Sequence, residues 1–128
     1  EMTEEQLDIP FRSGFFGTLY AMRAAYPHLK SRGGGSIINF GSSTALDGSP
    51  GFAPYAIAKE SIRAITRTAA VEWGPDNIRV NVVIPGSVLT PMTSPLWAKE
   101  GDGDGDINRA AADSNSGATI KPILRMPQ

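Results

Sequence analysis

A nearly unbroken apolar run at residues 78–84, IRVNVVI, constrains the fold of this chain more than any other stretch. Such a run is typical of a strand buried on both faces of a parallel sheet. Asn81 inside it needs polar partners, so we expect a structural role for it. A shorter run in residues 36–41 predicts a second strand, and a helical pattern over residues 53–73 separates the two. This order predicts an α/β fold: part of a doubly wound parallel sheet with flanking helices.

A second long helix is predicted over residues 3–31, with a kink at Pro10 and a regular part from Phe11 to Leu29. Both predicted helices carry an apolar stripe at helical spacing, which indicates a face packed against the sheet. The stripes consist of Phe11, Phe15, Leu19, Met22 and Tyr26, and of Ile62, Ile65, Ala69 and Trp73. Small residues form a second face on each helix, where another backbone could come close.

Three polar residues lie at the junction between the first strand and the helix after it. Ser42 follows the strand directly, at the position where open α/β sheets bind ligands. Tyr55 and Lys59 are four residues apart, so their side chains share one helix face. A free tyrosine has a pKa of about 10, and a nearby ammonium favours the phenolate form. The three groups could protonate a carbonyl or deprotonate an alcohol while a cofactor exchanges a hydride with carbon.

These residues resemble the signature of the short-chain dehydrogenase/reductase family. Residues 55–59, YAIAK, are similar to its YxxxK motif, and Ser42 lies thirteen residues before Tyr55, which is the usual family spacing. The segment GGGSIINFGSS resembles the strand before the catalytic serine, and residues 78–81 resemble the next strand. Residues 85–90, PGSVLT, resemble the PGxxxT cofactor loop. Several motifs in the family's order make this match specific.

The resemblance implies a nicotinamide-dependent Rossmann-like enzyme that interconverts a carbonyl compound and a secondary alcohol. Tyr55 would be the general acid/base, Lys59 would assist it and bind the nicotinamide ribose, and Ser42 would orient the substrate oxygen. The cofactor would be NAD or NADP, a choice these residues do not decide. The implied cofactor-binding residues are Tyr55, Lys59, Pro85, Gly86, Val88 and Thr90, and the implied substrate-binding residues are Ser42, Tyr55, Met92, Leu96 and Trp97. Thr90 could instead cap a helix before Pro91.

Gly14 stands where most family members have an asparagine that supports a water chain to the lysine. The absence of that side chain impairs the proton relay unless water or Ser13 substitutes for it; the alternative is a tightly packed glycine. The resemblance predicts one partial domain over residues 1–128. Its expected parts are the helix 3–31, strand 36–41, catalytic helix 53–73, strand 78–84, cofactor loop 85–90 and substrate lid 91–119.

The sequence begins at Glu1 and contains no GxGxxG-like turn. We therefore expect a fragment from which the N-terminal nucleotide-binding half of a family member is missing. The alternative function is a truncated, non-catalytic module of the same family that serves only in subunit interaction. Family members commonly dimerise through the two long helices, which implies a homodimer or homotetramer.

Composition limits the other function classes. The 12 basic and 13 acidic residues leave a net charge of −1, which predicts no nucleic-acid partner. The family resemblance implies a small carbonyl or alcohol substrate instead. The chain has no cysteine, so disulfides and thiolate metal sites are impossible. It contains neither an apolar run of about 20 residues nor a signal-peptide pattern, so we expect no membrane span and a cytoplasmic location.

Two further patterns in the sequence do not fit the functions that they resemble. Residues 102–113 place aspartates at positions of a calcium loop, but Ile107 stands where the loop needs glycine and Asp113 where it needs glutamate, so no metal is predicted. A serine hydrolase would need His28, the only histidine, as its base. That histidine lies on a distant helix, and no GxSxG motif surrounds Ser42.

Overall fold

The computed structural model describes residues 2–86, 88, 90 and 91. The chain divides into two units, Glu1–Ile84 and Pro85–Gln128, of which the first is described in full apart from residue 1. The first unit contains, in chain order, α1 (Glu4–Ile9), the π-helix η1 (Pro10–Phe16), α2 (Gly17–Ser31), β1 (Gly35–Phe40), α3 (Ser43–Asp47), α4 (Ala53–Trp73), the 3-10 helix η2 (Gly74–Asp76) and β2 (Ile78–Val83). None of the helices in this described part is long and apolar enough to cross a membrane.

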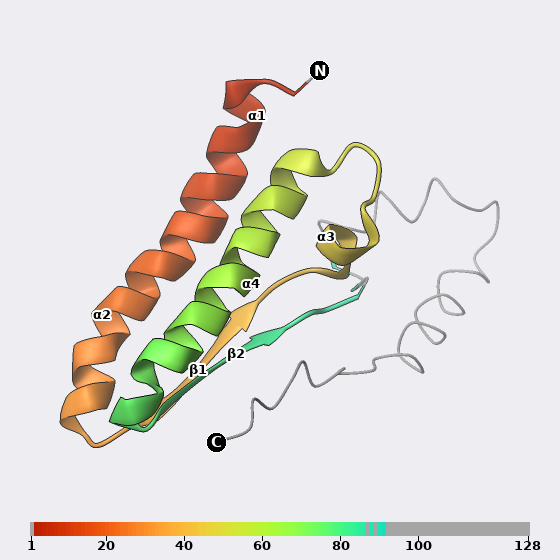
Figure 1. The fold of residues 1–128 in the computed structure, drawn as a ribbon. Helices are drawn as coiled ribbons and strands as arrows, with labels where there is room; N and C mark the ends of the chain where they lie inside the picture. The colour runs from red at the N-terminus through yellow and green to blue at the C-terminus, as the bar shows by residue number, and fades with distance from the viewer. Residues whose placement is uncertain (1, 87, 89, 92–128) are drawn as a thin grey trace. The chain divides into compact units, whose positions relative to one another are not determined.

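The two described strands pair in parallel, in a register that runs from Gly35 opposite Ile78 to Phe40 opposite Val83. Because parallel neighbours need a crossover, α4 returns the chain to the start of β2. Helix α4 contacts both strands, and α2 contacts β1 and α4. In Figure 1 the helical run α1–α2 lies beside α4, and both run along the sheet. The arrangement is the α/β architecture that the sequence predicts.

The core lies between these helices and the sheet. Met22 from α2, Ala69 from α4, and Ile78 and Val80 from β2 are buried together, and Ile62 is 1 % exposed on the same face of α4. Full burial of a side chain of this size contributes about 1.5–3 kcal/mol. These contacts hold α4 against the sheet. They therefore also position the side chains on the first turns of α4.

The expectation that residues 78–84 are buried on both sheet faces is wrong for this unit. Ile78 and Val80 are buried, but Arg79 and Asn81 are exposed on the opposite face. Ile38 and Phe40 in β1 are also 58 % and 57 % exposed. The reason is that the helices of this unit that contact the sheet cover the face of Ile78 and Val80. Asn81 therefore needs no buried partner here.

The regular helix expected from Phe11 to Leu29 is also interrupted. A capping box between Thr3 and Gln6 starts α1, as their spacing suggests, but residues 10–16 form a π-helix before α2 begins at Gly17. Pro10 lacks the N–H that an α-helix needs, and its ring crowds the carbonyl four residues earlier. A π-turn is a common way for a helix to absorb such a disruption.

A polar cluster joins the end of α2 to η2. The Tyr26 hydroxyl donates to Asp76 Oδ2 at 2.6 Å, and Lys30 Nζ lies 3.1 Å from Asp76 Oδ1. The bond from Tyr26, followed by that from Lys30, lowers the pKa of Asp76 below its ordinary 3.8. The bond to Asp76, followed by that to Tyr26, raises the pKa of Lys30 above 10.5. The cluster thus favours both charged forms.

Candidate active site

Tyr55 and Lys59 lie on the first two turns of α4. Pro54 stands in the opening turn, where its missing N–H would have had no partner within the helix. The four-residue spacing places both side chains on one face, and Lys59 Nζ lies 5.6 Å from the centroid of the Tyr55 ring. The Tyr55 side chain is 37 % exposed, so a ligand can reach it. The ammonium is therefore held next to the phenol.

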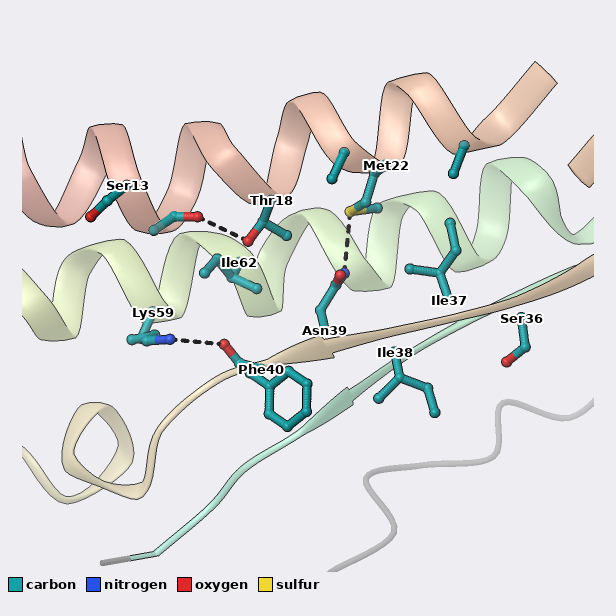
Figure 2. A pocket seen from close by; sticks show the side chains of 13 residues that line it. Ser13, Thr18, Met22, Ser36, Ile37, Ile38, Asn39, Phe40, Lys59 and Ile62 are labelled. Atoms are coloured by element: carbon teal, nitrogen blue, oxygen red, sulfur yellow. Dashed lines mark hydrogen bonds between the residues drawn. The ribbon is translucent and has the colours of Figure 1, made fainter. Parts of the chain in front are cut away.

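The position of Lys59 is fixed by the end of β1. Its Nζ donates a hydrogen bond at 3.2 Å to the main-chain carbonyl of Phe40, the last residue of the strand (Figure 2). An ammonium has three donors, so this bond leaves donors for other acceptors. The contact brings the charge of α4 to the carboxyl end of the sheet, where α/β proteins bind their ligands.

Ser42 lies two residues beyond Phe40, at the same end of β1. Ser42 has an extended backbone and is the N-cap residue of α3, but its side chain makes no capping hydrogen bond. Helix α3 was not predicted, because its sequence lies within a Gly/Ser/Pro-rich loop; it packs against α4. The hydroxyl of Ser42 is thus not used to cap α3.

Asn39 is a residue that the sequence analysis missed. It is 7 % exposed, and its Nδ2 donates to Thr66 Oγ1 of α4 at 2.8 Å. The same Nδ2 donates to Met22 Sδ of α2 at 3.2 Å (Figure 2). The Thr66 hydroxyl in turn donates to the Ile62 carbonyl. One amide thus ties β1 to both covering helices next to Phe40. A polar residue inside a short apolar run was the only signal for it.

An open pocket of about 500 Å³ lies between β1, α4 and the η1–α2 run, and Lys59, Asn39 and Ser13 line it (Figure 2). Gly14 lines it too, and a Cβ built on Gly14 would meet no atom within 4 Å. The alternative of a tightly packed glycine is therefore wrong. The Ser13 hydroxyl donates to the Ile9 carbonyl at 2.7 Å, so its oxygen remains able to accept.

The predicted cofactor loop belongs to the second unit. Of its residues, Pro85, Gly86, Val88 and Thr90 are described, and Val88 is 57 % exposed. Their roles therefore stay predictions. The expected substrate residues Met92, Leu96 and Trp97 and the aspartates at 102–113 lie outside the described residues. Within the described part, no group of three or more His, Asp or Glu side chains could hold a metal ion.

His28 lies in the last turn of α2, near the start of β1, whereas Ser42 follows its end. Six strand residues at ~3.3 Å each separate the two ends by roughly 20 Å. A hydrogen bond between the Ser42 hydroxyl and the His28 ring is therefore impossible in this fold. This geometry argues against a serine hydrolase.

Solved structures place the chain in a fold class. It superposes on a gluconate 5-dehydrogenase from Burkholderia cenocepacia, solved with NADP and tartrate, with a TM-score of 0.73 and 26% identity. The match covers 77% of this chain and 39% of that one. The structure is therefore part of a Rossmann fold, a parallel α/β sheet with helices packed on it.

The family follows from the sequence comparisons. Residues 1–122 match the family described as Enoyl-(Acyl carrier protein) reductase. A 12alpha-hydroxysteroid dehydrogenase from a Clostridium species is 51% identical over 83 residues, which are 65% of this chain and 32% of that protein. A trans-4-hydroxycyclohexanecarboxylate dehydrogenase from Sinomonas cyclohexanicum is 47% identical over 95 residues, 74% of this chain and 36% of that protein. The chain belongs to the short-chain dehydrogenase/reductase family, and it spans about a third of the length of these two relatives.

Proposed function

We propose that the protein containing this chain is an NAD(P)-dependent oxidoreductase that interconverts a secondary alcohol and a carbonyl compound. The observation that carries the proposal is the position of Lys59, bonded to the Phe40 carbonyl with its ammonium 5.6 Å from the Tyr55 ring centroid. The similar proteins named above are dehydrogenases, which supports the same reaction class.

In the oxidation direction, Tyr55 acts as the general base and takes the proton of the substrate hydroxyl. The carbon–hydrogen bond breaks as the carbon–oxygen double bond forms, and an oxidised nicotinamide bound at the site would accept the hydride. The positive charge of Lys59 stabilises the negative charge on the Tyr55 oxygen. Ser42 donates a hydrogen bond to the substrate oxygen and so orients it. In the reduction direction the Tyr55 hydroxyl returns the proton to that oxygen.

The nicotinamide of NAD or NADP supplies the hydride chemistry, which no side chain can provide. The donor set at the site suits this group, because the Lys59 ammonium has donors beyond the one used on Phe40 and ribose hydroxyls accept hydrogen bonds. Tyr55 would contact the same ribose. We assign the carboxamide of the ring to the backbone at Val88 and the hydroxyl of Thr90, in the cofactor loop that begins with Pro85 and Gly86. We propose that the substrate-binding site is lined by Met92, Leu96 and Trp97.

A homodimer or homotetramer is proposed for the protein, formed through the two long helices. Several of their large apolar side chains are exposed in the described unit, among them Phe16 at 38 % and Ile57 at 42 %. An exposed apolar surface of this kind commonly marks a protein interface. Light scattering on the purified protein would give the mass, and a monomer would refute this part. A cytoplasmic location remains a prediction.

The test of the function is the substitution Tyr55→Phe in the protein as its source makes it. We expect kcat to fall by about 10²-fold or more, because the proton acceptor is lost. Binding of NADH or NADPH, followed by nucleotide fluorescence, should persist. Tyr20→Phe is the matched control, because Tyr20 is an exposed tyrosine on the other long helix and should leave both quantities unchanged. Retained turnover in Tyr55→Phe would refute the role of Tyr55.

If the protein binds neither nucleotide and turns over no alcohol or ketone, the result would support the alternative function. The chain would then serve only as a non-catalytic module for subunit interaction.

A further inference from the structure

A second open pocket, of about 630 Å³, lies where α1 meets the start of α4, and Tyr55 forms part of its wall. The other side chains that shape it are Met2, Ile9, Pro10, Phe52 and Pro54. All of these residues belong to the first compact unit. Its volume falls in the range of small-molecule sites, which is ~300–1,000 Å³. None of its residues other than Tyr55 has a role in the function proposed above.

The surface of this pocket is mostly apolar and is open to solvent. Ile9 is 70 % exposed, Met2 47 % and Phe52 44 %. Among the described lining residues, Gln6 alone has an amide side chain, and its Oε1 already accepts a hydrogen bond from the Thr3 main-chain N–H in the capping box of α1. None of the described residues that line the pocket carries a charged side chain. A ligand that covered these side chains would gain the hydrophobic free energy of their burial.

Phe52 connects this surface to the proposed reaction centre. Its ring lies 6.5 Å from that of Tyr55, centroid to centroid, with an edge-to-face angle of 74°. Phe52 is the residue just before α4, and Tyr55 follows in the first turn. A compound whose oxygen reaches the Tyr55 hydroxyl therefore has an aromatic wall immediately beside it.

We propose that this pocket binds the apolar body of the substrate, an alicyclic ring or branched alkyl group next to the reacting carbon, with Phe52 and Ile9 as specificity-determining residues. The proposal rests on the function proposed above, because it takes the substrate oxygen to be at Tyr55. A polyhydroxylated substrate is disfavoured, because hydroxyls placed against Met2, Ile9 and Phe52 would lose water without gaining hydrogen-bond partners.

The experiment compares cyclohexanol with a hexose sugar as substrates of the protein as its source makes it. Phe52→Ala and Ile9→Gln should each lower kcat/KM for cyclohexanol by about tenfold, mainly through KM, as expected when apolar contacts are lost. Val71→Gln is the matched control, since Val71 is 65 % exposed on α4 and does not line the pocket. A higher kcat/KM for the hexose in the wild type, or unchanged cyclohexanol kinetics in both variants, would overturn the proposal.

A binding measurement separates the pocket from the reaction. Saturation-transfer NMR on the Tyr55→Phe variant should show cyclohexanol bound, and adding Phe52→Ala should weaken that binding by about tenfold. If the wild type turns over nothing yet this Phe52-dependent binding remains, the reaction fails and the pocket assignment stands. If Ile9→Gln splits an oligomer while cyclohexanol binding is unchanged, a second copy covers the pocket and the proposal is wrong.

Discussion

Lys59 Nζ donates a hydrogen bond to the main-chain carbonyl of Phe40, a residue nineteen positions earlier, at 3.2 Å. The contact links the second turn of α4 to the last residue of β1. It holds an ammonium at the carboxyl end of the sheet, one helical turn from the Tyr55 phenol. The proposed chemistry depends on this link more than on any other contact in the described unit.

Replacing Lys59 by methionine tests that dependence. We expect kcat/KM to fall by roughly 10²-fold or more, because the charge beside the proton-transferring group is lost. The melting temperature should change little, since the bond to Phe40 lies at an exposed position. Arg67→Met, which removes another exposed cation from α4, is the control and should keep full activity. A Lys59→Met enzyme within about threefold of wild type would show that the ammonium has no part in turnover.

The buried pair of Asn39 and Thr66 makes a prediction about stability. Asn39→Leu or Thr66→Val alone should each cost about 1–3 kcal/mol, because each change leaves the other group without its partner in a buried site. The double variant should cost less than the sum of the two. Urea denaturation of the four proteins gives the coupling free energy, expected at about 0.5–3 kcal/mol for residues in contact. Strict additivity would mean that the pair does not interact in solution.

The cluster of Lys30 and Asp76 predicts a pH dependence. The folded-state pKa of Asp76 is lowered, so its contribution to stability is present above pH 3.8 and is lost as the pH falls through the folded value. The pKa of Lys30 is raised, so its contribution is present below pH 10.5 and is lost as the pH rises through the folded value. The melting-temperature gap between wild type and Asp76→Asn should therefore stay constant near neutral pH and shrink in acid. A gap that widens in acid would contradict this assignment.

Two glycines should respond to alanine with opposite signs. Gly34 has a φ of +132°, and a Cβ there would lie 2.7 Å from Asn77 Nδ2, so Gly34→Ala should destabilise the protein by about 1–3 kcal/mol. Gly14 lies in a helical segment with nothing within 4 Å of its Cβ position. Gly14→Ala should stabilise by up to about 1 kcal/mol, because alanine is the better helix former. Chemical denaturation of both variants checks the two signs, and equal shifts would count against the geometry.

The parts that the sequence predicted are those with a local pattern. The helix expected over residues 53–73 appears as α4 with the same ends, because Pro54 and Gly74–Pro75 mark its limits and its apolar spacing repeats along it. Strand β1 and its position before Ser42 follow from a short apolar run between glycines and serines. Helix α3 had no such pattern, since its five residues lie in a loop-like stretch. In the folded chain α3 packs against α4, and its C-cap residue Gly48 adopts a left-handed backbone conformation.

The sequence by itself determined the α/β class and the shared face of Tyr55 and Lys59, because strand runs, helix periods and four-residue spacings are properties of adjacent residues. Only the tertiary structure decided that Asn39 meets Thr66, that Lys59 reaches Phe40, and that one sheet face carries exposed Ile38. Those contacts join residues far apart in the chain, so their geometry depends on how the helices settle on the sheet. The spacing of residues along the sequence does not specify these long-range contacts.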